Sequence, residues 1–108
     1  MVATTSVDLD VLERIGTALS DGVRCRILVR LLDGAAYPAE LAEALGESRS
    51  NISNHLTCLR GCGLVTTVRE GRNVRYQLAH RTLASALRKL GALPLVVEAG
   101  HPDLDGRR

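Results

Sequence analysis

The sequence is poor in aromatic residues: it has no Trp and no Phe, and its two tyrosines are Tyr37 and Tyr76. Proteins that hold single-stranded nucleic acid by stacking its bases need more aromatic side chains than this, whereas proteins that read an intact duplex do not. No apolar run reaches the ~18–20 residues of a membrane span. Residues 1–6 lack the basic start and apolar core of a signal peptide. We therefore expect a soluble, cytoplasmic protein with no membrane partner.

Cysteine is scarce, and lysine is almost absent. Three cysteines (Cys25, Cys58 and Cys62) in a chain without an export signal are more typical of thiols or metal ligands than of structural disulfides. Of the 14 basic residues, 13 are Arg, whose guanidinium groups bind phosphates and guanine edges better than lysine does. This composition is compatible with a protein that binds double-stranded DNA.

The net charge of +2 conceals an uneven distribution. Residues 48–81 contain six arginines and a single acid, Glu70, so this segment carries +5 and the rest of the chain carries −3. An ordinary solvated face mixes both signs. A concentrated basic segment on a nearly neutral protein instead predicts a binding surface for a polyanion.

Apolar periodicity and capping residues predict five helices and one hairpin, which fit one domain of this length. In the second helix the expected core stripe is Cys25, Leu28, Val29 and Leu32, so Cys25 is expected to be a core residue rather than a ligand. Asp21 and Ser48 are expected N-caps. The expected helices cover residues 7–19, 21–32, 38–45, 48–60 and 81–93, and the strands cover 64–69 and 73–78, joined by the connector 70–72.

This order of elements predicts a mainly α fold with a β-hairpin wing, a winged helix-turn-helix. The expected domain covers residues 7–93, and residues 94–108 form a tail that we expect to be mobile. The helix over 48–60 is the expected recognition helix, and the hairpin carries the wing arginines Arg69, Arg72 and Arg75.

The expected recognition helix divides into three stripes at 100° per residue. Ile52, Leu56 and Leu59 form the core stripe. A second, acid-free stripe carries donors that reach phosphates and base edges in the major groove: Arg49, Ser50, Ser53, Asn54, Thr57 and Arg60. The third stripe is Asn51, His55, Cys58 and Cys62. Its Asn51 and His55, together with the three wing arginines, complete the expected DNA-binding set.

Cys58 and Cys62 lie one helical turn apart, which puts their Cβ atoms roughly 5–6 Å from each other. A disulfide prefers about 3.8 Å, whereas a soft metal ion can bridge two thiolates at the wider spacing. The negative end of the helix dipole also favours a cation there over a lone thiolate. Two alternatives remain open, since buried cysteines often pack as small hydrophobes and a thiol pair can sense oxidants. His55 is expected to pack or to contact phosphate, with metal ligation a minor alternative.

Three segments resemble the ArsR/SmtB family of metal-sensing repressors, and within it the CmtR-type cadmium and lead sensors. They are residues 21–28, the stretch 48–65 around the cysteine pair, and the hairpin residues 70–76; the likeness extends over residues 9–93. The resemblance implies a homodimer, packed through its first and last helices, that represses its own operon and releases DNA when metal binds. It also implies that Cys58 and Cys62 are metal ligands.

In that sensor type a third cysteine comes from the C-terminal tail, but this tail has none. Asp103 occupies the aligned position and His101 lies two residues before it, so these two are the candidates for the third ligand. Either is harder than a thiolate, which would move the preference from cadmium or lead toward zinc. The other sites of the family are not expected, because the helix over 38–45 has no cysteine and His80 has no partner on its helix.

The function that these features predict is a metal-responsive repressor that binds operator DNA as a homodimer and releases it on binding cadmium or lead, with zinc as the alternative effector. A thiol redox or persulfide sensor of the same fold is the second hypothesis. We expect no enzyme, because a CxxxC spacing without a catalytic pocket does not suit a thiol oxidoreductase. A metal-storage protein would bind metal but not DNA, which the basic segment argues against.

Overall fold

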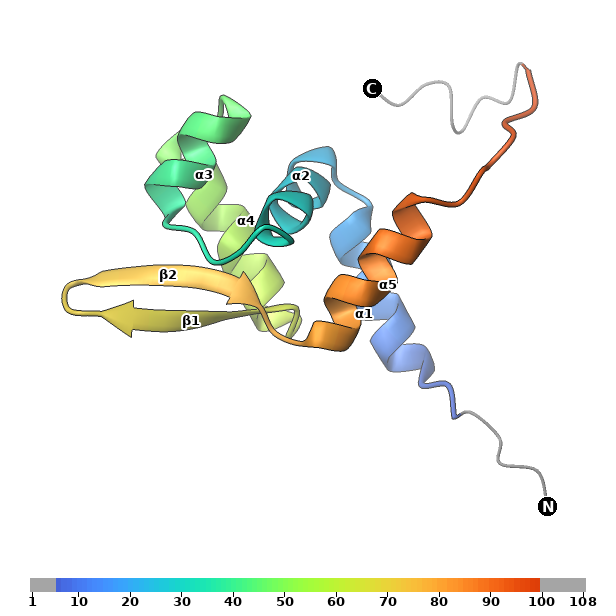
Figure 1. Cartoon of the computed structure of the whole chain (residues 1–108), viewed down its shortest axis with the longest axis horizontal. Coiled ribbons are helices and arrows are strands. Elements are labelled where there is room, and N and C mark those ends of the chain that lie inside the picture. Colours follow the sequence, from blue (N-terminus) through green and yellow to red (C-terminus); the bar gives the residue numbers. More distant parts are fainter. Residues whose placement is uncertain (1–5, 100–108) are drawn as a thin grey trace.

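The computed structural model describes residues 6–99 of the chain. In order along the chain, the elements of this part are α1 (Leu9–Leu19), α2 (Gly22–Leu31), α3 (Pro38–Leu45), α4 (Arg49–Gly61), β1 (Val65–Glu70), β2 (Asn73–Leu78) and α5 (Arg81–Gly91). The hairpin projects from one end of the molecule, and α1 and α5 lie together at the other end (Figure 1). The expected order of five helices and a hairpin wing is confirmed.

Local capping sets where the helices begin. Asp21 accepts hydrogen bonds from the backbone N–H groups of Val23 and Arg24, and Ser48 accepts one from Asn51, so both expected N-caps are confirmed. Asp8 caps α1 in the same way, and the first helix therefore begins at Leu9 rather than at residue 7.

The last helix ends earlier than expected, at Gly91 instead of residue 93. The ring of Pro94 disfavours a helical conformation at Leu93, so the helix terminates before the proline rather than at it. Residues 93–98 form neither helix nor strand. Gly46, with φ of +68°, ends α3 in the left-handed conformation that glycine adopts readily, and starts the turn to α4.

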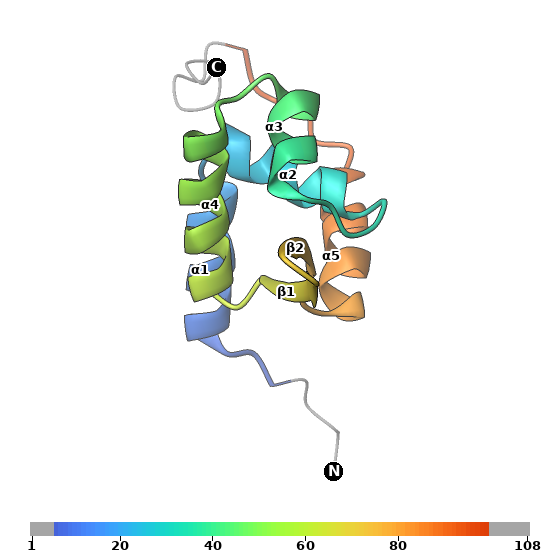
Figure 2. The same ribbon diagram turned by 90° about the vertical axis from the view of Figure 1, so that its left-hand side faces the viewer.

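The hairpin pairs antiparallel from Val65 opposite Leu78 to Glu70 opposite Asn73. Because Glu70 pairs, the connecting turn contains only Gly71 and Arg72, one residue fewer than expected. The base of the hairpin is also fastened to the segment before α3. Ala36 and Tyr76 exchange two backbone hydrogen bonds of 2.9 and 2.8 Å. Seen from the hairpin end, α4 runs along one edge of the molecule with the strands beside it (Figure 2).

One hydrophobic core draws on all the helices and on β1. Its fully buried large side chains are Ile27, Leu28, Leu41, Ile52, Leu56, Leu59 and Val65. The predicted core stripe of α4 is therefore confirmed.

The predicted core stripe of α2 is wrong apart from Leu28. The structure buries Ile27, Leu28 and Leu31, and leaves Val29 60% exposed. Arg24, one turn before Ile27 and Leu28, is half-buried. Arg24 can occupy this position because its guanidinium donates to the backbone carbonyls of Thr17 and Ala18 at the end of α1. The predicted stripe therefore misses Ile27 and Leu31 and includes Val29, which faces solvent.

Candidate nucleic-acid interface and cysteine pair

The exposed face of α4 consists of the residues that the sequence assigns to it. Ile52, Leu56 and Leu59 are buried, and the neighbouring stripe of Asn51, His55, Cys58 and Cys62 is half-buried. Every residue of the donor stripe is exposed: Arg49, Ser50, Ser53, Asn54, Thr57 and Arg60. The face presents guanidinium, hydroxyl and amide groups with no carboxylate, so it is suited to the phosphates and base edges of a duplex.

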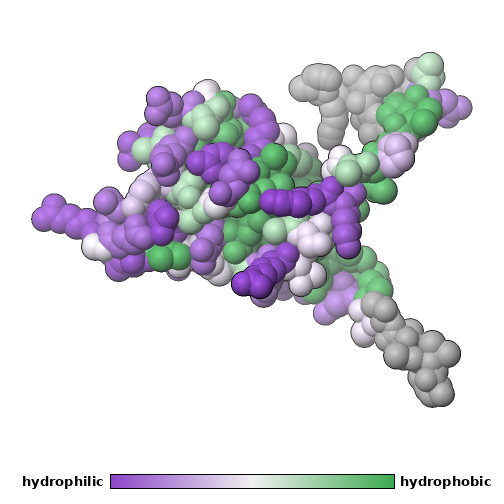
Figure 3. All heavy atoms as spheres, viewed as in Figure 1, coloured by the Kyte–Doolittle hydropathy of each residue, from purple (hydrophilic) through white to green (hydrophobic). Residues whose placement is uncertain are grey.

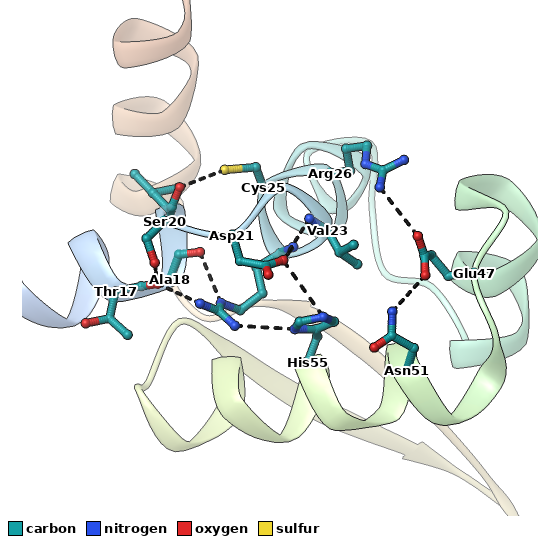
Figure 4. A network of polar contacts seen from close by, with 12 residues as sticks. Thr17, Ala18, Ser20, Asp21, Val23, Cys25, Arg26, Glu47, Asn51 and His55 are labelled. Carbon is teal, nitrogen blue, oxygen red and sulfur yellow. Dashed lines mark hydrogen bonds and ion pairs between the residues drawn. The ribbon is translucent and has the colours of Figure 1, made fainter. Parts of the chain in front are cut away.

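His55 is turned inward, against α2, and only 16% of its side chain is exposed. Its Nδ1 accepts a hydrogen bond from Arg24 Nη1 at 3.4 Å, and its Nε2 lies 3.8 Å from Asp21 Oδ1 (Figure 4). Through Arg24, this histidine is connected to the backbone carbonyls of Thr17 and Ala18. His55 therefore joins the recognition helix to the α1–α2 corner and lies off the exposed donor stripe.

Asp21 combines two roles in this network. Its carboxylate caps α2, and the backbone hydrogen bond from Arg24 lowers the pKa of Asp21, with further lowering from the Val23 N–H and His55, against an opposing effect of desolvation. The ionised carboxylate is thus the stable form at the point where α2 meets α4.

Asn51 makes a second connection between helices. Its Nδ2 donates to Glu47 Oε1 at 2.7 Å, and Glu47 Oε2 lies 3.6 Å from Arg26 of α2 (Figure 4). The predicted DNA contacts Asn51 and His55 are thus both engaged inside the protein, one at each of two successive turns of α4.

The wing arginines fall into three different situations. Arg72, in the turn, is exposed and forms no side-chain hydrogen bond or ion pair with residues 6–99. Arg69 is exposed and donates to the carbonyl of Gly71 at 3.2 Å. Arg75 is half-buried, and its guanidinium donates to Glu70.

Glu70 also accepts a 2.7 Å hydrogen bond from the Tyr37 hydroxyl. This bond, with the Arg75 charge, lowers the pKa of Glu70 despite partial desolvation. The same bond raises the pKa of Tyr37, because the neutral phenol is the donor. The contact between Tyr37 and Glu70 was not predicted from the sequence. The one available signal was the isolated acid in a basic segment.

Cys58 and Cys62 are free, half-buried thiols: Cys58 lies in the last turn of α4, and Cys62 is the C-cap residue that follows the helix. Cys62 packs against the core and lines a hollow of about 510 Å³ between α1 and the start of α5. Among the residues that the structure describes, no group of three or more His, Cys, Asp and Glu side chains could hold a metal ion. The candidate ligands His101 and Asp103 lie outside the described residues.

Cys25 is half-buried and donates to the Leu19 carbonyl at 3.2 Å.

Large apolar side chains remain exposed on α1 and around the end of α5. Leu12 and Leu90 are each 52% exposed, and the others on this side are Leu9, Val11, Leu93, Leu95, Val96 and Val97. In Figure 3 hydrophobic residues gather toward the segment after α5, whereas hydrophilic residues dominate the hairpin end. No helix within residues 6–99 has the length and hydrophobicity to cross a membrane.

Comparisons with known proteins agree with this geometry. Residues 21–67 match the family described as "Bacterial regulatory protein, arsR family". The chain is 58% identical over 91 residues to the HTH-type transcriptional regulator CmtR of Mycobacterium tuberculosis, a match that covers 84% of this chain and 77% of that protein. It is 36% identical over 75 residues to a probable mercury resistance operon repressor of Streptomyces lividans, covering 69% and 60%.

Two solved structures show the same fold. The NMR structure of the cadmium metal-sensor CMTR from Mycobacterium tuberculosis matches with a TM-score of 0.68 and 56% identity, over 88% of this chain and 99% of that one. A homodimeric winged helix-turn-helix DNA-binding domain from Mycobacterium bovis matches with a TM-score of 0.73 and 32% identity, over 77% of each chain.

The fold, with α3 and α4 as the paired helices and the hairpin beside them, defines a winged helix-turn-helix protein. The chain belongs to the arsR family of bacterial regulatory proteins. Its relatives are transcriptional regulators, in agreement with the expectation that the chain is not an enzyme.

Proposed function

We propose that this protein is a metal-responsive transcriptional repressor, which binds operator DNA as a homodimer and releases it when a soft divalent ion binds Cys58 and Cys62. The observation that carries the proposal is the composition of α4. One helix presents an acid-free donor face and, in its last turn and at its C-cap, two half-buried free thiols. An ion held by those thiols acts directly on the element that reads DNA. A similar chain from Mycobacterium tuberculosis is a cadmium metal-sensor.

The exposed donors of α4 would enter the major groove, and Arg69 and Arg72 of the wing would contact phosphates. Asn51, His55 and Arg75 are engaged inside the protein, so we place them behind the contact surface, where they hold it in shape. A repressor of this kind acts in the cytoplasm, where bacterial DNA lies.

The exposed apolar residues of α1 and of the end of α5 support a homodimer, because an uncovered apolar surface of this kind is typical of a subunit interface. In a symmetric dimer the two α4 helices would reach successive major grooves ~34 Å apart on a palindromic operator.

The two thiolates are soft ligands and favour cadmium or lead over harder ions. They provide two ligands, and no third donor joins them among residues 6–99. The rest of the ligand set would therefore come from residues 100–108 or from the second subunit. His101 and Asp103 are the candidates in the tail, and an oxygen or nitrogen donor there would favour zinc more than a third thiolate does.

Metal and DNA are coupled by linkage: an ion that binds the released state better must weaken DNA binding by the same coupling free energy, typically ~1–3 kcal/mol. That range corresponds to a loss of about 5- to 150-fold in DNA affinity.

The test is a fluorescence-anisotropy titration of reduced, metal-free protein on labelled DNA from its own upstream region, with cadmium, lead and zinc added separately at fixed salt. We expect release by cadmium or lead. Cys58→Ser and Cys62→Ser should bind DNA as the wild type does but lose the response to metal. Cys25→Ser is the matched control: it replaces a thiol that only donates to a backbone carbonyl, and should keep the full response.

Full release by metal from both Cys58→Ser and Cys62→Ser would refute the assignment of the thiols. Release by peroxide from metal-free wild-type protein, with no response to any metal, would support the redox hypothesis instead.

A further inference from the structure

Glu70 is the single acid within residues 48–81, and it lies at the wing end of the molecule. A carboxylate in that place would repel DNA phosphates, so it needs a compensating role. Its two oxygens have different partners: Oε1 accepts from the Tyr37 hydroxyl at 2.7 Å, and Oε2 accepts from the Arg75 guanidinium. Both partners come from outside β1.

Arg75 closes a triad with these two residues. Its Cζ lies 5.9 Å from the centroid of the Tyr37 ring, within the range of a cation–π contact. Its Nε is buried and has no acceptor among the described residues. The Arg75 side chain is therefore only partly exposed, and its guanidinium is held by a carboxylate and an aromatic face.

The triad joins the wing to the helix-turn-helix. Tyr37 immediately precedes α3, whereas Glu70 and Arg75 belong to the two strands. The base of the hairpin is already fastened there through the backbone bonds between Ala36 and Tyr76. The triad adds a side-chain attachment that includes Glu70, the last residue before the turn.

Beside the triad lies a hollow of about 510 Å³ between the wing and the starts of α3 and α4. Tyr37 and Glu40 line it on one side, Arg72 lines it from the wing and Arg49 from the recognition helix. Neither arginine forms a side-chain hydrogen bond or ion pair with residues 6–99, so both guanidinium groups remain available for phosphates.

We propose that Tyr37, Glu70 and Arg75 form a brace that fixes the wing relative to α4. The brace holds Arg72 and Arg49 where both can bind phosphates of the same duplex. Glu70 is a positioning residue for DNA binding, and Arg75 serves the brace rather than a phosphate. This inference rests on the proposed DNA-binding function. The brace predicts that removing Glu70 weakens DNA binding. Charge alone predicts the opposite, because removing an acid near DNA should strengthen binding.

The experiment compares Glu70→Ala with Glu43→Ala by anisotropy on the same operator DNA. Glu43 is the matched control, because it is exposed on α3 and has no side-chain partner among the described residues. We expect Glu70→Ala to weaken binding by about three- to tenfold, the effect of losing about one net hydrogen bond. Glu43→Ala should bind equally well or more tightly. Glu70→Gln, which is equally uncharged but keeps hydrogen-bonding groups, should recover part of the loss.

Two more variants separate the brace from a phosphate contact. Tyr37→Phe changes no charge and should weaken DNA binding, as Glu70→Ala does. The Tyr37→Phe/Glu70→Ala double variant should bind no more weakly than Glu70→Ala alone. Arg72→Ala should lower the slope of log affinity against log salt by about one per protomer, whereas Arg75→Ala should leave that slope unchanged.

Two results would overturn the brace. One is that Glu70→Ala binds DNA as tightly as Glu43→Ala does. The other is that Arg75→Ala lowers the salt slope as much as Arg72→Ala does. Failure of the wild type itself to bind the DNA would instead remove the proposed function, and the brace with it.

Discussion

Replacing Asp21 tests how the α2 cap supports the recognition helix. Its Oδ1 accepts two backbone hydrogen bonds, of 2.8 and 3.1 Å, and lies 3.8 Å from His55 Nε2. Loss of a two-bond N-cap costs about 1–2 kcal/mol, and each kcal/mol lowers the midpoint of thermal unfolding by about 4–8 °C in a domain of this size. Asp21→Ala should therefore lower the midpoint by about 4–16 °C.

Two further variants test whether the loss of stability comes from the missing cap. Asp21→Asn keeps a capping oxygen and should lose less than half as much stability as Asp21→Ala. Asp8→Ala removes the exposed cap of α1, which forms one bond of 2.9 Å and a longer one of 3.4 Å, and should cost about 0.5–1 kcal/mol. Asp21→Ala should weaken DNA binding as well, because His55 on α4 loses the carboxylate that faces it, whereas Asp8→Ala should not.

The contribution of Asp21 to the stability of the fold should also depend on pH. The pKa of Asp21 is lowered in the folded protein, so its contribution to stability is fully present above the unfolded pKa, roughly 3.9, and is lost as pH falls through the lower folded pKa. Asp21→Asn should lack this dependence. The assay is thermal unfolding followed by circular dichroism at one fixed protein concentration and several pH values. An Asp21→Asn variant as unstable as Asp21→Ala would refute the capping argument, because charge alone would then explain the loss.

Two further predictions concern the subunit interface and the brace. Leu12→Glu and Leu90→Glu should each convert the dimer to monomers in sedimentation velocity. Val29→Glu, at a similarly exposed position on α2, should leave the protein dimeric. Monomers from all three variants would refute the proposed subunit interface. Tyr37 should ionise above its ordinary pKa of about 10, and Glu70→Ala should return it toward that value, as followed by tyrosinate absorbance. Because the folded pKa of Tyr37 is raised, the stability that its hydrogen bond contributes is present below pH ~10 and lost as pH rises through the folded value.

Predictions based on local patterns agree with the structure except in the core stripe of α2. The division of α4 into buried, half-buried and exposed stripes follows from helical periodicity, and the burial of Ile52, Leu56 and Leu59 confirms it. The caps at Asp21 and Ser48 depend on hydrogen bonds to the next two or three residues, so they too can be read from sequence. The cysteine spacing is likewise local, but a third donor to such a pair can come from any part of the fold or from a second subunit, and no local pattern identifies it.

By itself, then, the sequence determined the order of the elements, the donor face of the recognition helix and the family, because helical period, capping and turn residues act over a few positions. Only the tertiary structure joined Arg24 to a backbone carbonyl at the end of α1, turned His55 inward and joined Tyr37 to Glu70. The last two contacts link residues 31 and 33 positions apart in the chain. They depend on how whole elements pack against one another, and a periodic pattern within one element carries no information about that packing.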